Sequence, residues 1–283
     1  MTQHPLRLPL RLPSIRKVTD DDRAIATLIL AVFRPRMDVY AKRIDTQAEA
    51  DELTAWHREH TKAGDRPYVV PIGAWQPAGK KGNRKPLTVE AVARHVAGVE
   101  TVGVYPLRPD GTCSSVSVDF DNHRGQRATE HDPRADYEAL AYTLARLGIR
   151  FLGNVSRGGR GFWIHLLPPA GTSARDARSV LHSLLASAGI RHIDQGGTFD
   201  CLFPKQDEPV SSGSTDSTNN PGNLFCLPCN RRWMESDHPG TQFVGTAPTA
   251  AQQREYLEEL LANTPDTADD PEPDAEPSDT AGP

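Results

Sequence analysis

The segment 115–189 constrains the fold most, because strand and helix patterns follow one another there in a definite order. Val116, Val118 and Phe120 alternate with polar residues over 115–121, which is typical of a strand with one buried face. The remaining predicted elements are a helix over 132–148, strands over 150–155 and 161–167, and a helix over 173–188. This β-α-β-β-α order predicts an α+β, split-βαβ sheet with helices on one face.

The rest of the chain divides around this segment. Capping-box patterns at Thr19 and Thr46 predict helices near 20–33 and 47–62, and a helix over 88–97 and a strand over 101–106 follow. The proline-rich ends are expected to be arms outside the fold. The expected parts are an arm over 1–14, an α/β module over 15–110, the split-βαβ part over 111–248, a helix over 249–263 and an acidic tail over 264–283.

Charge is distributed unevenly along the chain. The formal net charge is −5, but residues 264–283 hold seven acids and no base, so the body has 30 acids against 32 bases. A mildly basic body is compatible with an anionic partner such as nucleic acid. The longest apolar stretch, Ala24–Phe33, is too short to span a bilayer, and four irregularly spaced cysteines indicate no disulfide framework. We therefore expect a cytoplasmic protein with no membrane segment.

Two carboxylates stand at the end of the first predicted strand of the segment. Asp119 and Asp121 are two residues apart, so both point to the same face of a strand. Two such carboxylates can converge on a pair of divalent ions, as in phosphoryl transfer, and their hard oxygens suit Mg²⁺ or Mn²⁺. A solvated pair at a strand end is the alternative.

A glycine-rich turn, Ser156-Arg157-Gly158-Gly159-Arg160-Gly161, joins the next two predicted strands. Glycines allow a close backbone approach and arginines pair with phosphate oxygens, so the turn could hold an anion; an ordinary hairpin turn is the alternative. On the following strand, Trp163 and His165 share a face. His165 could donate to a triphosphate or be a structural histidine.

The cysteines and a basic cluster are ambiguous. Cys226 and Cys229 have the spacing of half a zinc site, but no second half follows, so we expect buried thiols rather than structural zinc. Lys80, Lys81, Arg84 and Lys85 form the cluster, which is either a contact for template phosphates or a solvated loop.

Taken together, these motifs resemble the archaeo-eukaryotic primase superfamily, and most closely the primase domain of TOTE conflict systems. The resemblance covers roughly residues 95–230, with the motifs in the family's order. The matching stretches are His95-x-x-Gly98, Thr101 to Leu107, Val118-Asp119-Phe120-Asp121, the Ser156 to Gly161 turn, Phe199-Asp200, Phe203-Pro204-Lys205-Gln206-Asp207, Gly222-Asn223-Leu224 and Leu227-Pro228.

The resemblance implies an RRM-like catalytic sheet packed against the N-terminal module and a template-directed nucleotidyl transfer that uses two divalent ions, Mg²⁺ or Mn²⁺. The implied metal ligands and catalytic residues are Asp119, Asp121 and Asp200. The implied nucleotide-binding residues are Ser156, Arg157, Gly158, Gly159, Arg160, His165 and Lys205. The implied partners are a single-stranded or primed DNA template and an NTP or dNTP. A helicase or nuclease would be a separate chain.

One motif departs from the family pattern. The family places histidine before tryptophan in its second motif, whereas here Trp163 precedes His165. An even step keeps His165 on the same face, displaced by about 6–7 Å along the strand. His165 then either takes the place of the family's histidine from this displaced position, or it does not. In the second case the domain is a catalytically weakened module that binds nucleotide and nucleic acid. A metal-dependent nuclease is the third alternative.

Overall fold

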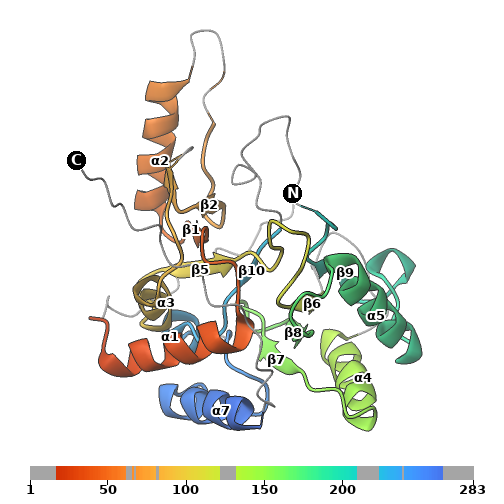
Figure 1. Ribbon diagram of the computed structural model, residues 1–283. Coiled ribbons are helices and arrows are strands. Elements are labelled where there is room, and N and C mark those ends of the chain that lie inside the picture. The colour runs from red at the N-terminus through yellow and green to blue at the C-terminus, as the bar shows by residue number, and fades with distance from the viewer. Residues whose placement is uncertain are drawn as a thin grey trace, which may run out of the picture.

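The computed structural model describes residues 17–61, 66, 68–80, 83–121, 132–208, 223–237 and 239–263, with only the backbone at Lys80, Asn83 and Asp200. The expected N-terminal arm, the acidic tail, Lys81, most of the polar loop 208–222 and the motif residue Gly222 lie outside this range. The described chain forms two antiparallel four-stranded sheets and a two-stranded hairpin, with helices around them (Figure 1). This α+β architecture confirms the predicted fold class.

The second sheet in chain order carries the segment 115–189. Its strands lie in the order β7-β8-β6-β9, and all three pairings are antiparallel. The strands are β6 (Val116–Phe120), β7 (Leu152–Val155), β8 (Phe162–Leu166) and β9 (Phe199–Phe203), and the helices between them are α4 (Pro133–Arg146), α5 (Ala174–Ser187) and the short 3-10 helix η1 (Ile193–Gln195). The chain order β6-α4-β7-β8-α5 is the predicted split-βαβ arrangement, and β9 adds a strand beside β6 that the sequence analysis did not predict.

Helices α4 and α5 cover one face of this sheet. The Asp132 side chain caps α4 by accepting from the Arg134 amide, and Pro133 opens its first turn. Leu140 and Leu144 are fully buried and pack with the apolar face of β6 and β8 in one core. The alternating residues of β6 therefore bury Val118 and Phe120 on the helix side.

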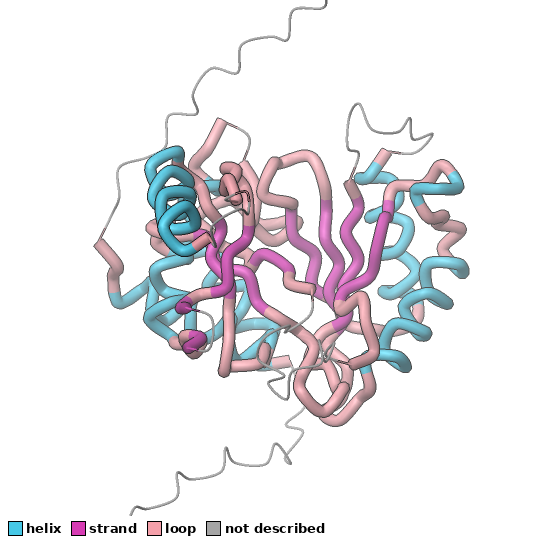
Figure 2. Tube along the Cα trace, turned by 90° about the horizontal axis from the view of Figure 1, so that it is seen from above, coloured by secondary structure: helices cyan, strands magenta, loops and turns pink. Residues whose placement is uncertain are grey.

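The first sheet is assembled from distant parts of the chain, in the order β10-β5-β1-β2. Its strands are β1 (Ala41–Arg43), β2 (Trp75–Pro77), β5 (Thr101–Val104) and β10 (Phe225–Cys226), and the hairpin strands are β3 (Gly79–Lys80) and β4 (Asn83–Arg84). The chain thus returns to the first sheet after completing the second. Figure 2 shows the strands in the middle of the molecule with helices on both outer sides.

The other helices lie outside the segment 115–189. They are α1 (Asp20–Phe33), α2 (Gln47–His60), α3 (Val89–Val96), α6 (Arg231–Met234) and α7 (Ala250–Ala262). Thr19 and Thr46 form the predicted capping boxes of α1 and α2. Helices α1, α3 and α7 pack together around Ile29, Phe33 and Val92 in a second core. None of the described helices is long and apolar enough to cross a membrane.

Candidate active site

A cavity of about 380 Å³ lies where the two sheets meet. Its polar wall comes from β6 and the glycine-rich turn: Asp119, Asp121, Ser156, Arg157, Gly158 and Arg160. Its apolar wall comes from both sheets: Trp75, Trp163, Phe203, Leu224, Phe225 and Cys226. The structure therefore brings the paired acids and the turn, which lie in separate segments of the sequence, to one cavity.

The two carboxylates of this wall stand at the end of β6. The backbone is fixed there because the Asp121 amide donates to the Thr198 carbonyl over 3.0 Å. The buried Thr198 hydroxyl in turn donates to Asp136 Oδ2 of α4 over 2.7 Å. The strand end that carries the acids is thereby tied to the start of α4.

A β-bulge lies beside Asp119. Phe120 pairs with Phe199 and Val118 with Leu202, so Asp200 and Cys201 on β9 stand opposite the single residue Asp119. Bulges of this kind re-aim side chains and are frequent next to active sites. The backbone of Asp200 is thus adjacent to Asp119, as expected if Asp200 is the third metal ligand. The convergence of all three carboxylates stays a prediction.

The glycine-rich turn is closed by Ser156. Its amide donates to the Gly161 carbonyl over 2.8 Å, and its hydroxyl accepts from the Gly161 amide over 2.9 Å. Gly159 adopts φ +71°, which favours glycine. A Cβ on Gly161 would stand 2.7 Å from the Phe120 carbonyl oxygen, so this glycine lets the turn sit directly against the end of β6. The two motifs are therefore in backbone contact.

The cations of the site differ in how they are held. Arg157 is partly buried, with its guanidinium 4.7 Å from the centre of the Trp233 ring. Burial lowers the pKa of Arg157, and the nearby Arg43 lowers it further. Arg160 is exposed, and Lys205 is exposed with its ammonium 5.4 Å from the centre of the Phe203 ring. Lys205 therefore stands beside a lining residue, at the rim.

Comparison with known proteins identifies the chain. Residues 25–269 match the family model described as the archaeo-eukaryotic primase domain of the TOTE conflict system. The chain belongs to this family. The family resemblance predicted from the motifs is confirmed, and the matched region begins well before residue 95. Membership places the domain among the primase-like nucleotidyltransferases.

Two further comparisons complete the description of this primase domain. Among solved structures, it is similar to the polymerase domain from Mycobacterium tuberculosis ligase D in complex with DNA, with 13% sequence identity and a TM-score of 0.37. The similarity covers 87% of this chain and 88% of that chain. No curated protein matches the chain significantly.

His165 does not reach the cavity of the primase domain. Its side chain is fully buried, and it packs against the Phe33 and Phe225 rings. The Ser117 hydroxyl donates to Nδ1 and Nε2 donates to Asn154 Oδ1, both over 2.7 Å. Burial lowers the pKa of His165 to about 3. In this arrangement the imidazole is a core group, and the expected contact with a triphosphate does not fit its position.

Trp163 occupies the cavity wall in its place. The two rings are stacked with centroids 5.8 Å apart, so Trp163 and His165 share a face as predicted, with only the tryptophan lining the cavity. Trp163 also packs against Phe203 at 5.2 Å. The side chain that β8 presents to the cavity is therefore a flat aromatic ring rather than the imidazole expected from the resemblance.

Sequence reasoning missed Trp75 and Trp233. Trp75 lines the cavity from β2, and a Cβ on Gly103 of β5 would stand 2.8 Å from its ring. A glycine inside a strand is a signal of such close approach. No sequence pattern distinguishes Trp233 in α6, because its role depends on Arg157, which is distant in the sequence. Arg84 and Lys85 of the basic cluster do not line the cavity, and the expected contact with template phosphates stays a prediction.

The donor set fits a hard divalent cation rather than zinc. Asp119 and Asp121 supply carboxylate oxygens, the ligands that suit Mg²⁺ and Mn²⁺. Among the side chains that the structure describes, no group of three or more His, Cys, Asp or Glu is placed to hold a metal. Burial raises the pKa of the Cys226 thiol to about 12, and the buried Cys229 thiol contacts Gln253 Oε1 at 3.6 Å.

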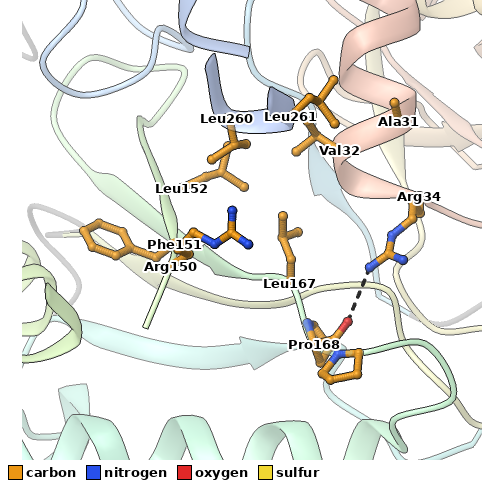
Figure 3. Close-up of a pocket in the computed structure, with 11 residues that line it drawn as sticks. Ala31, Val32, Arg34, Arg150, Phe151, Leu152, Leu167, Pro168, Leu260 and Leu261 are labelled. Carbon is orange, nitrogen blue, oxygen red and sulfur yellow. Dashed lines mark hydrogen bonds between the residues drawn. The ribbon is translucent and has the colours of Figure 1, made fainter. Parts of the chain in front are cut away.

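A second cavity, of about 260 Å³, lies away from these residues (Figure 3). It is bordered by the ends of α1 and α7 and by Leu152, Leu167 and Pro168. Its two arginines already donate to main-chain carbonyls: Arg34 to Pro168 over 3.4 Å, and Arg150 to Asn263. None of the predicted site residues lines it.

Proposed function

We propose that this domain is a template-directed primase-polymerase, which transfers a nucleotidyl group from an NTP or dNTP to a 3′-hydroxyl on DNA. The observation that carries the proposal is the shared cavity, which has two carboxylates on one wall and the arginine-bearing turn beside them. Nucleotidyl transfer needs this combination, because the reaction moves a phosphoryl centre away from a pyrophosphate leaving group.

The acids are proposed to hold the divalent ions. Asp119 and Asp121 would be ligands from β6, with Asp200 completing the set from the adjacent β9. When bound, the ions supply Lewis-acid stabilisation of the charge on the phosphate oxygens and the leaving group. The rigid strand end, tied to Thr198, holds the two carboxylates in place before the substrate arrives.

The turn and the rim are proposed to bind the triphosphate. Arg157 and Arg160 present guanidinium groups, which pair well with phosphate oxygens, and Lys205 adds a charge at the edge. The aromatic wall, with Trp75, Trp163 and Phe203, offers π-faces on which a base can stack. The cavity volume of 380 Å³ lies in the usual range for small-molecule sites.

Extension of a labelled primer on a DNA template with Mn²⁺ and each nucleotide tests the proposal. D119N and D121N are expected to lower the incorporation rate about 100-fold or more, because several kcal/mol of metal stabilisation are lost. D237N, at an exposed acid outside the cavity, is the matched control and should extend like the wild type. Undiminished incorporation by D119N or D121N would refute the mechanism.

One observation favours a second candidate, a domain that binds nucleotide and DNA with weakened turnover. His165 is enclosed in the core, so a polar contact of the second motif is missing from the cavity. The same assay separates the candidates when binding is measured alongside it. Binding of nucleotide and template without growth of the primer supports the second candidate, and shortening of the primer supports a nuclease.

A further inference from the structure

We propose that Trp233 is a positioning residue for Arg157 and that it orients this guanidinium toward the triphosphate of the nucleotide without neutralising its charge. The inference rests on the proposed function, because it names a residue that prepares the same site. Trp233 itself is absent from the cavity lining. It acts on the ligand only through Arg157.

The first observation is the environment of the Arg157 guanidinium. It lies 4.7 Å from the centre of the Trp233 ring, and it forms no ion pair with a carboxylate among the residues that the structure describes. A carboxylate partner would both orient an arginine and cancel its charge. An aromatic face orients the cation by a weaker attraction and leaves the charge available to an anion.

Asp45, the carboxylate whose charge acts to raise the pKa of Arg157, is already paired with two other arginines. Asp45 is buried and forms ion pairs with Arg43 and with Arg232, the second at 3.5 Å. The Thr101 hydroxyl also donates to Asp45. Two guanidinium groups, those of Arg43 and Arg232, therefore share the Asp45 carboxylate, and neither ion pair involves Arg157.

The Trp233 ring is held firmly enough to act as a platform. The indole Nε1 donates to Thr101 Oγ1 over 3.0 Å, and the Trp233 residue is only 7% exposed. Below it, Asn230 caps α6 and donates to the Glu100 carbonyl over 3.0 Å. Gly98, at φ +78°, lets α6 approach closely, since a Cβ there would stand 2.7 Å from the Arg232 amide nitrogen.

The backbone of Arg157 lies close to the same segment. The Gly240 amide donates to the Trp233 carbonyl over 3.1 Å. A Cβ on Gly240 would stand 2.6 Å from the Arg157 carbonyl oxygen, so the glycine lets the turn lie on this segment. The main chain and the guanidinium of Arg157 therefore both lie against α6 and the residues that follow it.

A double-mutant cycle tests this role, with inorganic tripolyphosphate and ATP, each with Mn²⁺, as the probes in a calorimetric titration. W233L is expected to weaken binding about five- to tenfold, the scale of a partly desolvated cation–π contact. W233F keeps an aromatic face and should bind within about twofold of the wild type. In the R157Q background, W233L should have little further effect, because the group that it orients is gone.

A second measurement needs no ligand. The Arg157 Nε–H resonance in a proton–nitrogen NMR spectrum should carry a ring-current shift in the wild type and in W233F and lose it in W233L. An unshifted Arg157 resonance in the wild type would overturn the placement even if W233L failed to fold. Thermal unfolding of each variant verifies that the folded proteins are being compared.

The outcomes separate the two proposals. If W233L binds the probes as tightly as the wild type, the inference is overturned and the proposed function stands. The same holds if W233L weakens binding as much in the R157Q background as it does in the wild type. Wild-type protein that binds neither tripolyphosphate nor ATP overturns the proposed function, and this inference with it.

Discussion

Two histidines enclosed in their neutral form should make the domain sensitive to acid. The side chains of His95 and His165 are fully buried, and burial lowers their pKa values to about 4 and about 3. An unfolded chain would restore the ordinary pKa of about 6.5. Lowering the pH from 7.5 to 5.5 is therefore expected to reduce the free energy of unfolding by about 3 kcal/mol.

The sign and size follow from proton uptake. The folded pKa values lie below the unfolded ones, so between pH 6.5 and about 4 the unfolded state binds protons that the folded state does not. This contribution to stability is fully present above pH 6.5 and is lost progressively as the pH falls toward the folded pKa. One unit below the unfolded pKa, each histidine costs about 1.4 kcal/mol.

The hydrogen bonds of His95 explain why it excludes a second proton. Its Nδ1 accepts from the Val102 amide over 2.9 Å, and a backbone amide can only donate. Its Nε2 donates to the Leu227 and Pro228 carbonyls, each over 3.1 Å. Protonation at Nδ1 would place two N–H groups against each other and break the link between β5 and the 227–230 segment.

Urea unfolding at pH 7.5, 6.5 and 5.5, followed by tryptophan fluorescence, measures this dependence. H165Q removes one of the two titrating groups and should reduce the change between pH 7.5 and 5.5 to about half. H60Q, at an exposed histidine of α2, is the matched control and should keep the wild-type dependence. A wild-type change of less than about 1 kcal/mol, or an undiminished change in H165Q, would refute the reasoning.

Two further predictions concern the backbone around the cavity. G161A should lower the free energy of unfolding, measured in urea, by about 1–3 kcal/mol and should also weaken ATP binding, because its Cβ would stand 2.7 Å from the Phe120 carbonyl oxygen. Unchanged ATP binding would show that this contact does not shape the turn. N230A should cost about 1–3 kcal/mol, because Asn230 is fully buried and holds both the α6 cap and a bond to the Glu100 carbonyl; a loss below about 0.5 kcal/mol in the same titration would contradict this.

The elements of the fold were accessible from sequence because their signals are local. The alternation of Val116, Val118 and Phe120 indicates which face of β6 is buried, and it does so without knowledge of the elements that cover this face. The Thr19 and Thr46 capping boxes and the Asp132-Pro133 pair form within one turn of the helices that they begin. Such patterns depend on neighbours in the chain and need no knowledge of the tertiary contacts.

The candidate site was accessible only in part. The order of the motifs predicted that the acids and the glycine-rich turn belong together, and both line the cavity. The step of two residues also placed Trp163 and His165 on one face. The burial of His165 was not predictable, because Phe33 and Phe225, which pack against it, come from distant parts of the chain.

The sequence by itself determined the α+β class, the split-βαβ order and the family, since periodicity, caps and ordered motifs are written along the chain. Only the tertiary structure decided that His165 is a core group and that Arg157 lies on Trp233. Burial and cation–π contact are properties of groups brought together from separate elements, here the turn after β7 and the helix α6. The residue pattern of one segment does not indicate which side chain of another segment will pack against it.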